Sequence, residues 1–167
     1  MTTTRANGTT IEMLYRQYSS ALVLFAAAIA GDRARAQDAV HHVFAKLLAQ
    51  GIDHADNAKA YLFASVRNAI LNDAKARGRE VALDAGIAWF EPPERDYAGE
   101  LRLRQALAAL DGGQREVTVL HIWGELTFAE IGEVLGVSPN TAASRYRYAL
   151  AKLRELLCAR EGCHAGS

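Results

Sequence analysis

Apolar residues recur three and four positions apart along most of the chain, which is the spacing of helices with one buried face. In the N-terminal half this spacing predicts helices within residues 11–25 and 36–48, and a third that begins after Asn57, a good helix cap, and ends at Gly78. Each predicted helix has an apolar stripe along one face. In chain order, the stripes consist of Ile11, Leu14, Tyr15, Tyr18, Leu22 and Phe25; of Ala36, Ala39, Val40, Val43, Phe44, Leu47 and Leu48; and of Leu62, Phe63, Val66, Ala69 and Ile70. Three such helices can bury one core.

The helical pattern stops between residues 81 and 99, where Pro92 and Pro93 break any helix. Helical spacing resumes in residues 100–110, 114–123, 127–135 and 139–158, and no useful length of chain alternates as a strand would. The fold is therefore predicted to be all-α, with a helical domain over residues 1–80, a linker over 81–99 and a second helical domain over 100–167. We expect the two domains to fold separately.

Charge changes sign along the chain, although the formal net charge of its 167 residues is zero. Basic residues outnumber acidic ones in residues 59–80 and again in residues 137–160, and acidic residues predominate between these segments. The net charge alone indicates no nucleic acid, membrane or acidic substrate, so any such partner must be inferred from the distribution of charge.

The apolar runs are too short to predict a membrane span. The longest, Ala21–Ala30, is about half of the roughly 20 residues that a bilayer requires, and the N-terminus lacks the apolar centre of a signal peptide. We therefore expect a cytoplasmic protein without membrane insertion. Cys158 and Cys163 lie near the C-terminal end and are expected to be free thiols.

A helix-turn-helix is predicted for residues 128–145. Gly136 can adopt the left-handed conformation of a tight turn, Ser138 can cap the second helix, and Pro139 suits its first position. One face of the second helix is apolar and is formed by Ala142, Tyr146, Ala149, Leu150, Leu153 and Leu157. Its other face is polar and basic.

This polar face fits the major groove of DNA, because small polar residues and arginine near the start of such a helix reach base edges and later basic residues meet phosphates. The candidate DNA contacts are Asn140, Thr141, Ser144, Arg145, Arg147, Tyr148 and Lys152. A solvated amphipathic helix in a helical hairpin would show a similar pattern, but it would not require the capped turn.

The third predicted helix has a second polar face, roughly opposite its apolar stripe. Aromatic, amide and basic side chains together suit single-stranded or melted DNA, because bases stack on aromatic rings and phosphates need cations. The candidates are Tyr61, Arg67, Asn68, Asn72, Lys75 and Arg79. Taken alone, this pattern also fits a solvated basic face.

The segment from Leu110 to Leu156 resembles the C-terminal promoter-binding domain of the extracytoplasmic-function (ECF) sigma factors of bacterial RNA polymerase. The residues that carry the resemblance are Gln114, Arg115, Glu116, Val117, Glu130, Ile131, Leu135, Gly136, Val137, Ser138, Thr141, Ser144, Arg145, Lys152, Leu153 and Arg154. Residues 14–50 and 60–71 resemble the first domain of the same family, in the same order along the chain.

The resemblance implies a transcription initiation factor with core RNA polymerase and promoter DNA as partners, and it makes an anti-sigma protein a plausible third partner. The residues that match the helix docking on the polymerase clamp are Asp38, His41, His42 and Phe44. The helix from Tyr61 to Arg79 matches the reader of the minus-ten element, and the loop Gly51–Ala58 would hold a flipped base. The helix from Thr141 to Lys152 matches the reader of the minus-thirty-five element. No catalytic residue, cofactor or metal is implied.

The chain also departs from the family's usual residues. His41-His42 stands where Gln-Glu is usual, and Asn72 stands where Asp is usual. In the predicted helix-turn-helix, Gly132 replaces a usual Ala, and Ala142 and Ala143 replace a Val and often a Lys. These differences bear on polymerase affinity and on the promoter sequence that is read.

Three other functions fit parts of the sequence. An enzyme would use Asp38, His41 and His42 as metal ligands or acid–base groups, but adjacent histidines point about 100° apart on a helix. A small metal or redox sensor would use Cys158, Cys163 and His164, but no fourth ligand is evident. A helix-turn-helix regulator that never engages polymerase is the strongest rival, although it has no need of the matching N-terminal half.

Overall fold

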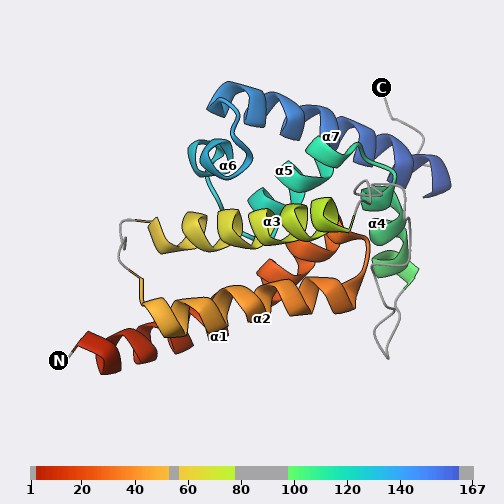
Figure 1. Ribbon diagram of the computed structural model, residues 1–167. Coiled ribbons are helices and arrows are strands. Elements are labelled where there is room, and N and C mark those ends of the chain that lie inside the picture. The colour runs from red at the N-terminus through yellow and green to blue at the C-terminus, as the bar shows by residue number, and fades with distance from the viewer. Residues whose placement is uncertain (1–2, 53–56, 78–97, 162–167) are drawn as a thin grey trace.

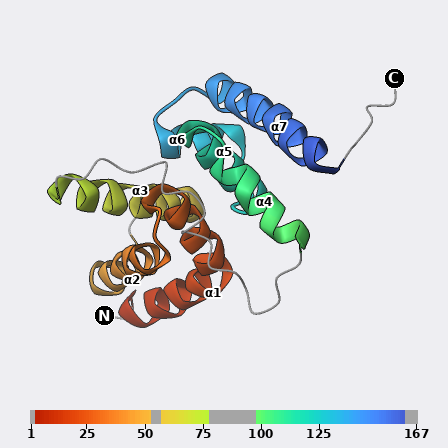
Figure 2. The same ribbon diagram turned by 90° about the vertical axis from the view of Figure 1, so that its right-hand side faces the viewer.

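The computed structural model describes residues 3–52, 57–77 and 98–161, and these ranges contain helices and no strand. The helices are α1 (Thr3–Ala30), α2 (Arg33–Gln50), α3 (Ala58–Ala76), α4 (Ala98–Ala108), α5 (Gly112–Ile122), α6 (Phe128–Leu135) and α7 (Pro139–Glu161). They form two units, α1–α3 and α4–α7, which lie side by side (Figures 1 and 2). The predicted all-α fold is confirmed. Most of the predicted linker lies outside the described residues, and α4 begins at Ala98, inside it.

The α1–α3 unit buries most of the apolar stripes that the sequence predicts. Phe25 of α1 and Phe63 of α3 are fully buried, and their rings meet edge to face with centroids 5.7 Å apart. Burial of a side chain of this size stabilises the fold by about 1.5–3 kcal/mol. Two predicted members of the stripes lie outside this core, since Tyr15 is 38% and Leu48 59% exposed.

Local polar residues set the starts of α2 and α3. The Asp32 carboxylate accepts a hydrogen bond from the Ala34 N–H at 2.9 Å, and the Asn57 side chain accepts one from the Ala60 N–H at 3.1 Å. Each bond satisfies a backbone donor that has no partner within its helix. The predicted Asn57 cap is confirmed.

The predicted helix-turn-helix is formed by α6 and α7. Gly136 has φ 70°, the left-handed conformation predicted for the turn, and the Val137 N–H donates to the Gly132 carbonyl at 3.0 Å. The turn folds back closely on α6, because a Cβ atom added to Gly132 would lie 2.5 Å from the Val137 carbonyl oxygen. The departure from the family's usual alanine at position 132 therefore coincides with a close backbone approach.

The two units pack against each other, with α3 on α6 and α1 on α5, and their buried apolar residues form one continuous core. The contact is close at Gly124, where an added Cβ atom would lie 3.2 Å from Cζ of Phe63. We expected two domains that fold separately; the structure joins them, and their independent folding stays a prediction.

Helix α1 is long and apolar enough between Thr10 and Ala30, by length and composition alone, to cross a membrane. Core helices meet the same criteria, and Leu22, Phe25 and Ile29 of this segment are buried inside the protein.

The close approach at Gly132 yields a stability prediction. We expect Gly132→Ala to lower the free energy of unfolding by about 1–2 kcal/mol, because a contact with backbone at 2.5 Å places the overpacking cost at about 2–3 kcal/mol, above the roughly 1 kcal/mol gained in helix propensity. Chemical denaturation of wild type and variant measures this change in the free energy of unfolding. Ala129→Gly, at an exposed position of the same helix, calibrates the propensity effect, and a more stable Gly132→Ala protein would contradict the close approach.

Candidate functional site

The start of α7 is built as the sequence predicts. The Ser138 hydroxyl accepts a hydrogen bond from the Thr141 N–H at 3.1 Å and lies 2.9 Å from the Thr141 hydroxyl. Ala142, Ala149 and Leu153 of the predicted packing face are buried, whereas Leu150 of that face is 42% exposed. The candidate contacts Asn140, Thr141, Arg147, Tyr148 and Lys152 are exposed. Ser144 is half-buried and accepts a hydrogen bond from Arg147 at 3.3 Å.

Arg145 does not join this exposed row. Its side chain is half-buried, and its guanidinium lies over the start of α5, where a Cβ atom added to Gly113 would be 3.2 Å from Nη1. The guanidinium also contributes to the electrostatic environment of Glu116 on α5. In this structure Arg145 therefore connects α7 to α5, and its contact with DNA stays a prediction.

The polar face of α3 is divided in the same way. Tyr61, Asn68, Asn72 and Lys75 are exposed, as a binding surface requires. Arg67 instead donates from Nε to Glu116 Oε2 at 3.2 Å, and its side chain is 24% exposed. Its guanidinium is thus engaged with the other unit. Arg79 lies outside the described residues.

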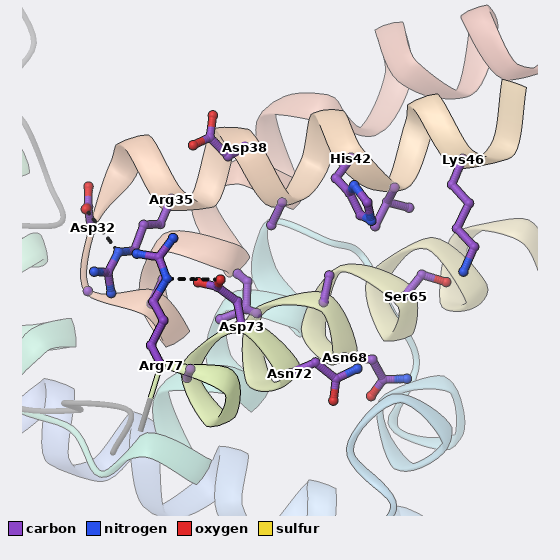
Figure 3. Close-up of a pocket in the computed structure, with 17 residues that line it drawn as sticks. Asp32, Arg35, Asp38, His42, Lys46, Ser65, Asn68, Asn72, Asp73 and Arg77 are labelled. Atoms are coloured by element: carbon purple, nitrogen blue, oxygen red, sulfur yellow. Dashed lines mark ion pairs between the residues drawn. The ribbon is translucent and has the colours of Figure 1, made fainter. Parts of the chain in front are cut away.

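Between α2 and α3 lies an open groove of about 690 Å³ (Figure 3). It brings Asp38 and His42, predicted to contact polymerase, to the same groove as Asn68 and Asn72, predicted to contact DNA. The Asp73–Arg77 ion pair, at 3.2 Å, closes one part of its rim. The predicted polymerase surface of α2 and the predicted DNA surface of α3 therefore lie next to each other.

The two histidines of α2 face different surroundings. Both are exposed, but His42 lines the groove whereas His41 Nε2 lies 3.3 Å from the Tyr15 hydroxyl on α1. This divergence is the one expected for adjacent helix residues. The exposure predicted for Asp38 is also observed.

Phe44 requires a correction. It was predicted to contact polymerase, but only 5% of the residue is exposed, and its ring meets Tyr15 edge to face at 5.0 Å. Its position in the apolar stripe of α2 decided its environment. Phe44 can support a docking surface from beneath, but it offers little contact area.

Arg115 and Glu116, adjacent residues of α5, meet on the boundary between the units. Arg115, 3% exposed, donates to the carbonyls of Leu107 at 3.0 Å, Ala108 at 2.6 Å, Leu110 at 3.0 Å and, in the other unit, Ala28 at 3.4 Å. Burial raises the pKa of Glu116 above its usual value, and the neighbouring guanidiniums, that of Arg67 first, partly oppose this rise. In the sequence, these two residues served only to support the family resemblance. Their position as a charged pair between apolar residues of a predicted helix was the signal that could have indicated a buried polar contact.

A capping box at the start of α6 was also missed. The Thr127 hydroxyl accepts from the Glu130 N–H at 3.2 Å, and Glu130 accepts in return from the Thr127 N–H at 3.0 Å. The spacing Thr127-x-x-Glu130 before an apolar run is the sequence signature of this motif. Glu130 also accepts from Asn57 of the other unit at 2.9 Å, so the cap is shared with the contact between units.

No group of three His, Cys, Asp or Glu residues that could hold a metal occurs among the described residues. Cys158 is a half-buried free thiol, and Cys163 and His164 lie outside the described part of the chain. The alternative of a C-terminal metal or redox sensor, which would also use Cys163 and His164, is therefore not tested by the described residues.

Comparison with known families accounts for both units. The Sigma-70 region 2 model matches residues 14–80, which contain α2, α3 and most of α1, and the Sigma-70 region 4 model matches residues 100–153, which run from α4 into α7. The relatives that match along most of the chain are ECF sigma factors, and the chain belongs to this family. This confirms the resemblance read from the sequence. This sigma factor is thus a transcription initiation factor of the kind that binds RNA polymerase.

Its relatives agree with this assignment. The ECF RNA polymerase sigma factor SigL of Mycobacterium tuberculosis is 28% identical over 158 residues, covering 89% of each chain. EcfG of Rhodopseudomonas palustris is 29% identical over 139 residues, covering 80% of this chain and 77% of its own. The sigma factor RpoE of Bartonella quintana, solved with the anti-sigma factor NepR, matches with a TM-score of 0.69 at 23% identity, over 87% of this chain and 95% of its own, and that likeness shows the fold.

The capping box of this sigma factor should contribute a measurable, pH-dependent stability. Hydrogen bonding by the Thr127 N–H is the main cause that lowers the pKa of Glu130 below its ordinary 4.5. The charged form then stabilises the fold fully above pH 4.5, and this contribution is lost as pH falls through the lower folded-state pKa. We expect Thr127→Ala to cost about 1 kcal/mol at neutral pH.

Glu130→Gln is the matched control, because glutamine can keep the capping bonds but cannot titrate. Denaturation from pH 7 to pH 3 should show a smaller loss of stability with falling pH for Glu130→Gln than for wild type. Equal pH dependence of the two proteins would exclude the ionised capping box.

Proposed function

We propose that this sigma factor binds core RNA polymerase through the exposed side of α2, reads the minus-ten element with α3 and reads the minus-thirty-five element with α7. Its role is regulatory, without an enzymatic reaction of its own, and its place of action is the cytoplasm, where polymerase works. The observation that carries the proposal is the exposed polar row of α7, which follows directly on the capped turn of a helix-turn-helix.

The α7 row has the chemistry of a major-groove reader. Thr141 and Asn140 stand in the first turn, where short polar side chains reach base edges, and Arg147 and Lys152 follow, where cations reach bases or phosphates. Tyr148, 65% exposed, adds an aromatic surface without a partner in the core. An isolated helical hairpin would not need this row of exposed polar, aromatic and basic side chains to fold.

The α2–α3 groove supports the other half of the proposal. Asp38 and His42 line it from α2, and the exposed amides of Asn68 and Asn72 line it from α3. Polymerase bound on α2 would therefore lie beside the proposed minus-ten surface. Tyr61 and Lys75, also exposed on α3, supply a stacking surface and a cation for a melted strand.

An anti-sigma protein is a further proposed partner. The support is the likeness of the fold to RpoE of Bartonella quintana, a sigma factor solved with the anti-sigma factor NepR. The rival function, a helix-turn-helix regulator that does not engage polymerase, predicts no complex with core enzyme.

The direct test is size-exclusion chromatography with core RNA polymerase, followed by promoter binding and transcription by the complex. Arg147→Ala should weaken promoter binding by about 1–3 kcal/mol and leave association with core enzyme unchanged. Arg154→Ala is the matched control, because Arg154 is an exposed arginine of the same helix outside the proposed row. Failure to co-elute would favour the rival regulator, and equal losses for both variants would remove Arg147 from the interface.

His42 provides a charge test of the α2 surface. The family's usual glutamate at this position implies a basic docking surface on polymerase, and histidine does not supply that negative charge. His42→Glu should therefore bind core enzyme more tightly than wild type.

His42→Gln is the matched control, because glutamine is polar and cannot carry a negative charge. It should not show the gain in affinity that glutamate brings. Fluorescence anisotropy with labelled sigma factor measures the affinity of all three proteins for core enzyme. Equal affinities of wild type and His42→Glu would show that His42 has no part in docking.

A further inference from the structure

One side chain contacts three elements of the α4–α7 unit, at the point where the helix-turn-helix packs on α5. His121 is half-buried in the last turn of α5. Its ring stacks on that of Phe128, the first residue of α6, with centroids 4.6 Å apart, and meets that of Tyr146 on α7 at 4.5 Å and an interplanar angle of 65°. The rings of Phe128 and Tyr146 are 5.6 Å apart. These three residues, the His121 cluster, therefore connect α5, α6 and α7.

A hydrogen bond to the backbone fixes how the imidazole lies. His121 Nδ1 is 2.9 Å from the Leu126 carbonyl oxygen, which can only accept, so Nδ1 carries a proton and donates. Leu126 is buried and directly precedes Thr127, whose hydroxyl caps α6. The imidazole is thus held against the chain just before α6, while its ring contacts both helices of the helix-turn-helix.

Tyr146 joins the His121 cluster to the proposed DNA-reading row of α7. It is half-buried and directly precedes the exposed Arg147. A movement of its ring would rotate or shift α7, and every side chain of the row with it. Hydrogen bonds to base edges require donor–acceptor distances of about 2.7–3.2 Å and good alignment, whereas contacts to phosphates carry no sequence information. Displacement of α7 should therefore reduce sequence discrimination before it reduces DNA binding in general.

We infer that His121 is a positioning residue for promoter recognition: its ring, oriented by the Leu126 carbonyl, holds α7 at the rotation at which Asn140 and Thr141 reach base edges. No contact between His121 and DNA is required. Histidine combines two properties that other residues supply singly, since phenylalanine has a flat ring without a donor, and asparagine has an N–H donor without an aromatic ring. The inference rests on the proposed function, because it takes α7 as the reader of a promoter element.

The first experiment measures sequence discrimination by the holoenzyme. Promoter fragments are selected from a pool of random duplexes by core RNA polymerase saturated with the wild-type sigma factor. Discrimination is the affinity for a selected fragment divided by the affinity for the same fragment with the element proposed for α7 scrambled. His121→Phe keeps the ring contacts and should discriminate as wild type does. His121→Asn keeps a donor but loses the ring contacts, and its discrimination should fall about tenfold or more.

Stability measurements separate positioning from folding. Chemical denaturation should show both variants less stable than wild type, because His121→Phe leaves the carbonyl of buried Leu126 without this donor and His121→Asn loses the aromatic contacts. Only His121→Asn should lose discrimination, and both should bind core enzyme as wild type does. Ile122→Ala, at the exposed neighbouring position of α5, is the matched control and should keep wild-type discrimination. Equal loss of discrimination by His121→Phe and His121→Asn would overturn the positioning role of the ring.

A double-mutant cycle tests whether His121 acts through Tyr146. In a Tyr146→Leu background, His121→Asn should reduce discrimination much less than in wild type, because the ring that it would release is already gone. An equal further loss in both backgrounds would overturn this route to α7. If the wild-type holoenzyme selects no fragment, the proposed function fails and the inference fails with it. If the wild type discriminates and His121→Asn discriminates equally well, the inference alone is overturned.

Discussion

The arrangement of the helices depends on the hydrogen bonds of one buried cation, the guanidinium of Arg115. It donates to carbonyls at the end of α4, to Leu110 in the following turn and to Ala28 near the end of α1. The last carbonyls of a helix lack partners within it, and a buried charge is stable only where hydrogen bonds replace water. Arg115 meets both requirements, and it fixes α5 against its own unit and against the other one.

With α5 fixed, the next residue along it is fixed as well. Glu116 points about 100° away from Arg115 around the helix, toward the boundary where Arg67 of α3 and Arg145 of α7 approach. Helix α5 contains no predicted DNA contact, yet it determines where arginines of both proposed DNA-reading helices lie. The electrostatics of the interface are therefore set by a helix whose main role is packing.

Local backbone chemistry, by contrast, shapes the reading end of α7. The capping box of Thr127 and Glu130 begins α6, the left-handed Gly136 ends it, and Ser138 begins the next helix within two residues. Gly132 lets the turn approach α6 more closely than a methyl group would allow. These contacts span few residues, so the geometry of the turn does not require the other unit, although Asn57 adds a hydrogen bond to Glu130 from there.

The sequence alone determined the features that depend on neighbours along the chain. Helical spacing, the Asn57 and Ser138 caps, the turn at Gly136 and the exposed row of α7 were all predictable, because each arises within about one or two helical turns. The family was predictable too, because its motifs are local strings of residues. Only the tertiary structure decided that Leu48 of the predicted stripe is exposed, that Arg67 pairs with Glu116, and that the two units share one core. Arg67 and Glu116 are 49 residues apart, and which side chains meet at that separation is set by how helices pack in space, a relation that periodicity along one helix does not contain.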